Sequence, residues 1–191
     1  MASVGKAQPP SGSRKNLIPV PAARSELADI GAPQPLLPYG PPPTMQVSLS
    51  DCRSNRFLAA LAPVDIARWL PHFDSMEVSP GMVLVEAHAR QRHVFFPLTA
   101  VLALDRTSSA GPSAEIAVIG REGFAGMPVV LGGTSALDRT AVRLPGRLLR
   151  LPARCVEAEM EKGAAVMRHL LHFTSALLLQ MAHMEACAAQ A

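Results

Sequence analysis

Four short runs of strand-forming residues stand close together in the middle of the chain, and they restrict the fold more than any other feature. Turn-forming stretches such as HARQR and SSAGPS separate them, and apolar, β-rich runs bounded by such stretches are typical of strands. Strands joined by short turns pair antiparallel, so the pattern predicts a sandwich or barrel. TAVRL and RLLRL, separated by Pro145 and Gly146, extend the prediction by a hairpin. The four runs are MVLVEA (82–87), HVFFPL (93–98), VLALDR (101–106) and AEIAVIG (114–120).

Helical periodicity flanks this region on both sides. Before it, apolar residues in NRFLAALAPVDIARWLPHF recur at helical spacing in two short pieces, with Asn55 as a cap and Pro63 opening the second piece. After it, PARCVEAEMEK predicts a short helix, Gly163 a break, and residues 164–188 a long helix. The chain is therefore expected to be an α+β protein, an antiparallel β jelly-roll with short N-terminal helices and a long C-terminal helix.

The long helix carries an apolar seam whose members stand three and four residues apart, widened by Leu171, Leu178 and Leu179. Such a seam can pack on its own β domain or pair with its copy in a second subunit. We expect both, which predicts a homodimer formed through this helix. The seam consists of Val166, Leu170, Phe173, Leu177, Met181, Met184 and Ala188.

The N-terminal segment differs from the rest in composition. Ten of the 18 prolines lie between Pro9 and Pro43, and Tyr39 is the only aromatic residue in that stretch. Such a segment buries too little apolar surface to offset the entropy of ordering it. The expected organisation is a disordered Pro-rich arm over residues 1–54, a β-roll over 55–163 and a dimer helix over 164–191.

Composition excludes several classes of protein. No apolar run is long enough to span a bilayer and MASVGKAQPPSG lacks the apolar core of a secretory signal, which predicts a cytoplasmic protein without membrane contact. The three cysteines are far apart and lack metal-ligand spacing, so we expect free thiols. The net charge of +3 does not indicate nucleic-acid binding. The arginines at 143, 147, 150 and 154 scatter over both strand faces and are expected to be solvated.

The stretch GREGFAGMPVVLGGTSALDRTAV (120–142) has the makings of an anion cradle. Gly126 permits close backbone approach where a short helix would begin, and Pro128 fits the first turn of that helix. A helix N-terminus offers unpaired N–H groups and a positive dipole end to a phosphate. Arg139 can add a charge-assisted pair and Thr140 a hydroxyl. These residues predict a site for a small anionic effector such as a phosphate.

The order of these elements resembles the cyclic-nucleotide-binding domain of the catabolite-activator (Crp/Fnr) family of bacterial regulators, from about Asn55 to Cys187. RHVFFPLTAVLAL, AEIAVIGREGFAGMPVVLGG and PGRLLRLPA carry the resemblance. It implies that the β-roll is a ligand sensor and the long helix a dimer seam. It also implies that the cassette positions for the ligand are held by Gly126, Met127, Arg139, Thr140 and Ala141.

The cassette departs from the family pattern at Met127, where the cyclic-AMP sensors have a glutamate that accepts from the ribose 2′-hydroxyl. A hydrogen bond to a charged group contributes about 1.5–3 kcal/mol, so its loss lowers affinity about tenfold to more than a hundredfold. The loop 131–139 is longer than in the activators, Asp138 is placed to neutralise Arg139, and alanine or histidine replaces two turn glycines. We expect a degenerate pocket; cyclic AMP, another small anion and no small ligand all stay open.

The C-terminal end of the chain bears on whether it could bind DNA. Members of the family continue into a helix-turn-helix after the long helix, whereas this chain stops at HMEACAAQA. We expect a truncated regulator that senses and pairs, with DNA bound only by a full-length form; a stand-alone sensor and a dimerising decoy are the alternatives.

The strongest enzyme alternative is a cupin-like metal-dependent jelly roll. EAHARQRH offers Glu86, His88 and His93, but Arg90 stands where the cupin pattern needs a histidine and no acid follows. In the long helix, His169 and His172 have no adjoining metal ligand and are expected on a solvated face. With no metal site and no nucleophile–base pattern, we expect no enzyme.

Overall fold

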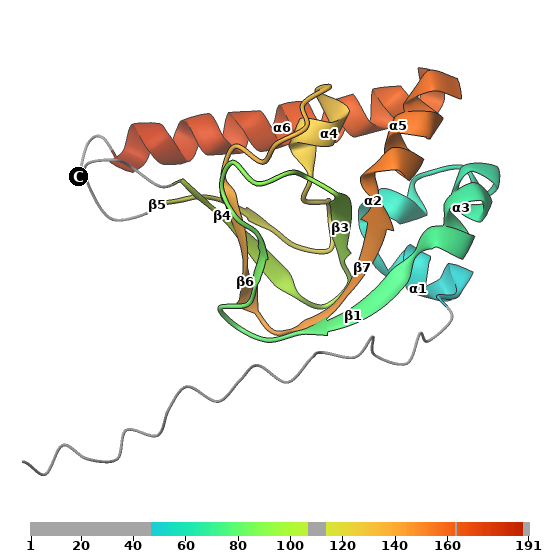
Figure 1. Cartoon of the computed structure of the whole chain (residues 1–191), viewed down its shortest axis with the longest axis horizontal. Helices are drawn as coiled ribbons and strands as arrows, with labels where there is room; N and C mark the ends of the chain where they lie inside the picture. The colour runs from blue at the N-terminus through green and yellow to red at the C-terminus, as the bar shows by residue number, and fades with distance from the viewer. Residues whose placement is uncertain (1–46, 107–113, 163, 189–191) are drawn as a thin grey trace, which may run out of the picture. The chain divides into compact units, whose positions relative to one another are not determined.

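Two antiparallel sheets and a set of helices make up the computed structural model, which describes residues 47–106, 114–162 and 164–188 (Figure 1). The predicted α+β class with antiparallel sheets is confirmed. One sheet has the strand order β1 (Asp74–Val78), β7 (Gly146–Pro152), β3 (His93–Pro97). The other has the order β2 (Val83–Val85), β6 (Arg139–Leu144), β4 (Val101–Arg106), β5 (Ala114–Ile119).

The last two strands do not form the hairpin that was predicted across Pro145 and Gly146. Strand β6 pairs with β2 and β4, whereas β7 pairs with β1 and β3, so the link passes from one sheet to the other. Gly146 has φ of 151°, and a Cβ there would lie 2.6 Å from the backbone nitrogen of Ala100. The backbone N–H groups of residues 98–100 all donate to the carbonyl of Arg147. The contact with residues 98–100 therefore places β7 in the other sheet, and the residues of the turn itself do not reveal that contact.

The four predicted runs form β2 to β5, with β2 shorter than expected. Strand β1 was not predicted, because DSMEV has only one β-branched residue and no clear alternation. Pairing with β7 holds it in place, and Arg150 Nη2 donates to Asp74 Oδ2 across the pair at 2.9 Å.

The N-terminal helices begin earlier than predicted. Helix α1 (Leu49–Ser54) lies within the range expected to be a disordered arm, so that boundary was wrong; residues 1–46 of the arm lie outside the described residues. Helix α2 (Arg56–Ala59) has the predicted cap, since Asn55 Oδ1 accepts from the backbone N–H of Leu58 at 3.0 Å. Pro63 opens α3 (Pro63–Trp69), also as predicted, and a 3-10 turn η1 (Leu70–His72) follows.

Asn55 also joins the helices to the β domain. Its side-chain amide donates to the carbonyl oxygens of Pro97 and Gly123, both at 2.9 Å, and the side chain is fully buried. A buried amide with all these partners fixes both contacting loops, because leaving any of them unpaired would be costly.

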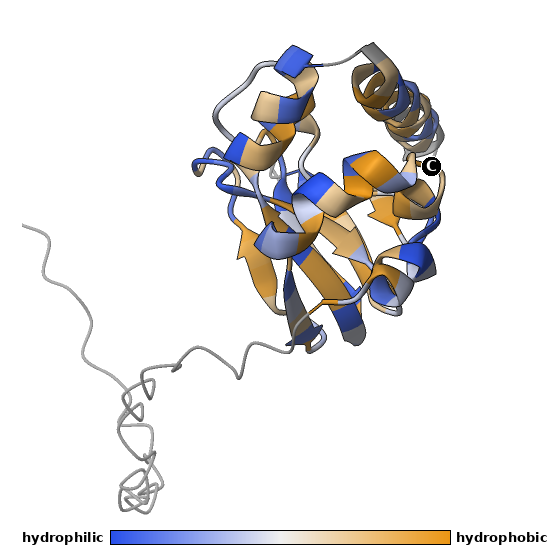
Figure 2. Ribbon diagram, turned by 90° about the vertical axis from the view of Figure 1, so that its right-hand side faces the viewer, coloured by the Kyte–Doolittle hydropathy of each residue, from blue (hydrophilic) through white to orange (hydrophobic). Residues whose placement is uncertain are grey.

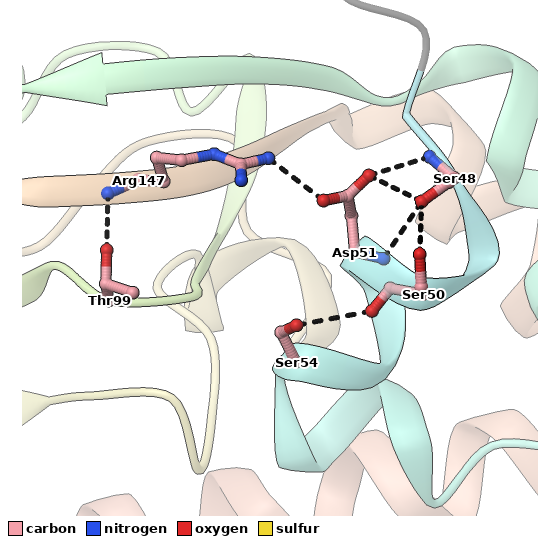
Figure 3. Close-up of polar contacts among 6 residues, drawn as sticks. All are labelled: Ser48, Ser50, Asp51, Ser54, Thr99 and Arg147. Carbon is pink, nitrogen blue, oxygen red and sulfur yellow. Dashed lines mark hydrogen bonds and ion pairs between the residues drawn. The ribbon is translucent and has the colours of Figure 1, made fainter.

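Helix α1 is held by a capping box and one ion pair, as Figure 3 shows. The backbone N–H of Asp51 donates to Ser48 Oγ at 3.2 Å, while Asp51 Oδ2 accepts from the backbone N–H of Ser48 at 3.0 Å. Asp51 Oδ1 accepts from Arg147 Nη2 at 3.0 Å, and the backbone N–H of Arg147 donates to Thr99 Oγ1. The hydrogen bonds from Ser48, and then the Arg147 guanidinium, lower the pKa of Asp51.

Two helices follow β7: α5 (Ala153–Lys162) and α6 (Ala164–Ala188), both as predicted, while the expected break at Gly163 lies outside the described residues. The apolar interior, orange in Figure 2, forms two clusters. Helix α6 contributes to both, with Val166 and Leu170 in one and Leu177 and Met181 in the other. Phe173 packs against both clusters, so α6 joins them.

The outward side of α6 is also apolar. Leu171 and Leu178 are 40% and 43% exposed, and Leu179 and Met184 are exposed too. His169 is not on a solvated face as predicted. Its ring stacks on Phe57 with centroids 4.5 Å apart, and its Nε2 lies 3.2 Å from the carbonyl oxygen of Phe57.

Cys52 and Cys155 are free thiols, as predicted. Cys52 is fully buried, and burial raises the pKa of its thiol to about 11. Burial also raises the pKa of the half-buried Cys155. Across the three described ranges, no helix combines the length and the apolar character needed to cross a bilayer.

Candidate functional site

The cassette is built around α4 (Met127–Val130), whose N-cap is Gly126 as predicted. Gly126 has φ of 132°, in the region that favours glycine. A Cβ there would lie 3.0 Å from Val94 Cγ2 and 3.2 Å from Val94 Cα. Phe95 and Ala125 exchange two backbone hydrogen bonds, of 2.8 and 2.9 Å, beside this contact. The absence of a side chain at Gly126 therefore lets strand β3 pack closely against the start of α4.

The cavity beside α4 is small, about 20 Å³. That is room for about one water molecule, whereas sites for small-molecule ligands are of the order of 300–1,000 Å³. Three of the five predicted cassette residues line it, and Arg139 and Ala141 do not. The lining residues are Gln91, Leu104, Ile119, Gly126, Met127, Pro128, Ala136, Leu137, Asp138, Thr140 and Leu177.

Met127, where the resemblance implied a glutamate, is buried beside the cavity. Its side chain is 5% exposed and belongs to the second core cluster, as does Leu177 from α6. Thr140 is buried and lines the cavity, while Ala141 is buried without lining it. The cassette side chains that reach the cavity are therefore mostly apolar, and they pack against α6.

Arg139, the predicted phosphate ligand, is engaged by two carboxylates. Its Nη1 donates to Asp105 Oδ2 at 3.1 Å, and its Nε lies 3.5 Å from Glu86 Oε2. The prediction that Asp138 neutralises Arg139 was wrong, because the buried Asp138 carboxylate accepts from Arg106 Nε at 2.9 Å. Asp105 stands opposite Arg139 in the β4–β6 register, a cross-strand pairing that the sequence alone did not reveal.

The cassette loop is fixed by the turn between β2 and β3. His88, where the resemblance implied a glycine, has φ of 63° and is the only non-glycine residue of the described ranges with positive φ. Its backbone N–H donates to the carbonyl of Ala136 at 2.8 Å, and that of Gln91 donates to Thr134 at 2.9 Å. His88 is in the left-handed region, which histidine adopts more readily than most residues.

A second and larger hollow, of about 520 Å³, adjoins the first, and Gln91 lines both. It lies between the 90–93 turn and the start of α5. Sequence reasoning missed it, since its basic residues come from two distant segments; the only signal was RQRH beside one turn and Arg154 after Pro152. The lining residues are Arg90, Gln91, Arg92, His93, Thr134, Pro152, Ala153, Arg154 and Glu157.

The second hollow is electropositive. Arg90, Arg92 and Arg154 are exposed, and none has an ion pair within the described part of the chain. Burial, followed by the guanidinium of Arg150 and then those of Arg92 and Arg154, lowers the pKa of His93. The arginines expected to be solvated at 143, 147 and 150 are instead paired with Glu115, Asp51 and Asp74.

The residues of the cupin alternative do not converge. Glu86 turns to Arg139, His88 occupies the turn and His93 begins β3. Within residues 47–106, 114–162 and 164–188, no group of three or more His, Cys, Asp or Glu side chains is placed to hold a metal ion.

Comparison with known proteins places the fold but not the family. No protein-family model matches the chain, and no curated protein matches it. A candidate cyclic nucleotide-binding protein from Geobacter metallireducens matches with a TM-score of 0.59 and 14% identity, over 72% of this chain and 99% of that one. The sensor domain of the transcriptional regulator DNR from Pseudomonas aeruginosa gives 0.56 and 14%, over 69% and 88%.

The Thermus thermophilus catabolite activator protein gives a TM-score of 0.54 and 18% identity, over 71% of this chain and 63% of that protein. The chain therefore spans less than two thirds of that regulator. All three structures are similar to this chain in fold at low sequence identity. The chain therefore shares its fold with a candidate cyclic nucleotide-binding protein, with the sensor domain of a transcriptional regulator and with a catabolite activator protein.

Proposed function

We propose that this chain is the sensor and dimerisation module of a regulator of the Crp/Fnr type, with a degenerate cassette that does not take cyclic AMP. The observation that supports the proposal is the small size of the cavity beside α4, about 20 Å³, which Met127 and Leu177 line as members of one core cluster. The fold shared with cyclic-nucleotide-binding proteins and with DNR supports the sensor class.

Binding of a cyclic nucleotide would require two rearrangements at once. Arg139 would have to leave Asp105 and Glu86 before it could pair with a phosphate. Met127 and Leu177 would have to leave the core, which exposes apolar surface at about 25 cal/mol per Å². Both changes subtract from the affinity that the ligand contacts supply.

The contact of Leu177 with the cavity supports a sensing role for the same region. Leu177 lies on α6, so any change in what fills the cavity acts directly on that helix. A ligand shifts the state of a protein only by the difference in its affinity for the two states. A small effector, or the repacking of Met127 itself, would meet that condition through α6.

The outer side of α6 is proposed to pair with its copy in a second subunit. Leu171 and Leu178 are seven residues apart and exposed, at the spacing of a coiled-coil seam. The proposal places the module in the cytoplasm and assigns no DNA contact to the described residues; in a Crp/Fnr-type regulator that contact belongs to a helix-turn-helix domain. No observation favours the metal-dependent enzyme, and it is not proposed.

Titration calorimetry of the full chain with cyclic AMP, cyclic GMP and a cyclic dinucleotide tests the cassette. We expect no saturable heat that depends on Arg139 from any of the three. The control variant is Arg143→Gln, because Arg143 is also an ion-paired arginine of strand β6. Micromolar binding of cyclic AMP that is lost in Arg139→Gln and kept in Arg143→Gln would overturn the proposal.

Sedimentation velocity tests the pairing of α6. The wild type is expected to sediment as a dimer, and Leu171→Glu with Leu178→Glu as a monomer. Leu144→Glu, an exposed leucine on β6, is the control and should stay dimeric. A monomeric wild type, or a double variant that stays dimeric, would contradict the dimerisation role.

A further inference from the structure

We propose that the hollow between the 90–93 turn and α5, named here the arginine cleft, binds a small ligand that carries a phosphate or polyphosphate group. It is defined by Arg90, Arg92, His93, Arg154 and Glu157 together with the backbone around them. The proposal goes beyond the proposed function and does not depend on the cassette.

The size of the cleft suits a small ligand. Its volume of about 520 Å³ lies within the usual range for small-molecule sites, about 300–1,000 Å³. The neighbouring cassette cavity, at about 20 Å³, holds nothing of that size.

The charge of the cleft indicates an anion. Arg90, Arg92 and Arg154 approach one hollow from two segments, and none has an ion pair within the described residues. Six other arginines of the described ranges are paired with acids, whereas Arg53, Arg56, Arg121 and Arg168 have no ion pair there but do not gather around one hollow. Three guanidiniums and the single carboxylate of Glu157 leave a net positive charge around the hollow, and an anion bound among the guanidiniums lowers their mutual repulsion. The paired arginines are Arg68, Arg106, Arg139, Arg143, Arg147 and Arg150.

The backbone holds the two arginine-bearing segments together. The N–H of Ala153 donates to the carbonyl oxygen of Arg92 at 2.9 Å, and β3 pairs with β7 up to His93 and Pro152. The first turn of α5 lines the cleft and carries no acidic side chain. A helix of this length adds a positive dipole end to the field of the guanidiniums.

The geometry points to phosphate chemistry because guanidinium groups present planar pairs of donors that match phosphate oxygens. Three such groups around one hollow suit a ligand with several charged oxygens better than a single carboxylate. Glu157 also lines the hollow, so a ligand there meets three guanidiniums and one carboxylate.

Titration calorimetry of the full chain with inorganic pyrophosphate and tripolyphosphate tests the proposal. We expect saturable binding that is weakened at least tenfold in the double variant Arg92→Gln/Arg154→Gln. The control is Arg53→Gln/Arg121→Gln, which removes the same charge from two exposed arginines outside the cleft and should change affinity less than twofold. Because all four arginines are exposed and without an ion pair in the described ranges, both double variants are expected to fold, and thermal unfolding checks this.

Three results would overturn the proposal. One is the absence of binding up to about 5 mM probe, which is weaker than any specific site of this kind. Another is equal weakening in the cleft variant and its control, which marks general charge attraction. The third is citrate binding as tightly as tripolyphosphate, which removes the phosphate preference. Tripolyphosphate binding is expected to be unchanged in Arg139→Gln, which would show that the probe does not bind at the cassette.

Discussion

Two hollows share one wall at Gln91, and they differ in every property that decides ligand binding. The cassette cavity is about 20 Å³, and it is lined by buried apolar groups with its nearby charges in pairs. The arginine cleft is about 520 Å³, and its three guanidiniums have no ion pair within residues 47–106, 114–162 and 164–188. The part of the fold that resembles a ligand site is filled, and the part that has no counterpart in that resemblance is open.

The difference shows that one fold can hold a nearly filled cavity and an open hollow side by side. At the cassette, two charged side chains are paired within the protein: Arg139 with Asp105, and Asp138 with Arg106. In the arginine cleft the charges are left unpaired. Where unsatisfied groups gather, a site is open to a partner from solution.

The largest expected effect comes from emptying the cassette cavity. Leu177→Ala should lower the free energy of unfolding by about 2–5 kcal/mol, since a buried leucine is removed and the space is only partly refilled. Leu144→Ala, at a position 55% exposed, should stay within about 0.5 kcal/mol. Guanidinium denaturation measures both. A loss below about 1 kcal/mol for Leu177→Ala would mean that the cavity is not tightly filled.

Gly126 offers the next test of how closely the cassette is packed. Gly126→Ala should cost about 1–3 kcal/mol, from backbone strain together with the contact of the new Cβ with Val94. Gly132 also has positive φ, 76°, but open space around it, so Gly132→Ala should cost only about 1 kcal/mol of backbone strain. Urea denaturation of both variants isolates the Val94 contact. Equal losses of unfolding free energy in the two variants would show that the contact of Gly126 with Val94 of β3 is not tight.

Paired and unpaired arginines should respond differently to neutralisation. Arg147→Gln removes the ion pair with Asp51 and should lower stability by about 0.5–1 kcal/mol. Arg154→Gln should leave stability unchanged or raise it by a few tenths of a kcal/mol, because it relieves repulsion in the arginine cleft. Thermal unfolding at low salt compares the two. A clear loss of stability in Arg154→Gln would mean that Arg154 has a structural partner.

The smallest expected effect is the pH dependence contributed by Asp51. The pKa of Asp51 in the folded chain lies below its ordinary value of 3.8, so its contribution is fully present above that pH and is lost as pH falls through the folded pKa. The stability advantage of the wild type over Asp51→Asn should therefore shrink below about pH 4. Urea denaturation between about pH 2.5 and 6 measures it. An advantage that grows on acidification would contradict the sign.

Local signals in the sequence predicted local structure. The cap at Asn55, the opening proline Pro63, the glycine before α4 and the long helix over 164–188 all depend on nearby residues, and all four were found as predicted. The seam on α6 was predicted from its period, and its inner members Leu170 and Leu177 are buried.

Features that depend on distant contacts could not be predicted in this way. Strand β1 exists through its pairing with β7, and the transfer of β7 to the second sheet depends on the loop before β4. The acid that neutralises Arg139 is set by strand register, which no spacing of adjacent residues reveals. The arginine cleft joins Arg92 and Arg154 across two segments and carries no motif.

The position of β7 at the centre of its sheet has a consequence for the order in which the chain can fold during synthesis. Both of its neighbours, β1 and β3, are made first, and neither pairs with the other. A nascent chain that has not reached Gly146 therefore carries two strands with unpaired edges, and such edges recruit other chains. The three-stranded sheet forms only when its middle strand leaves the ribosome, so the second half of the β domain controls whether the first half stays soluble.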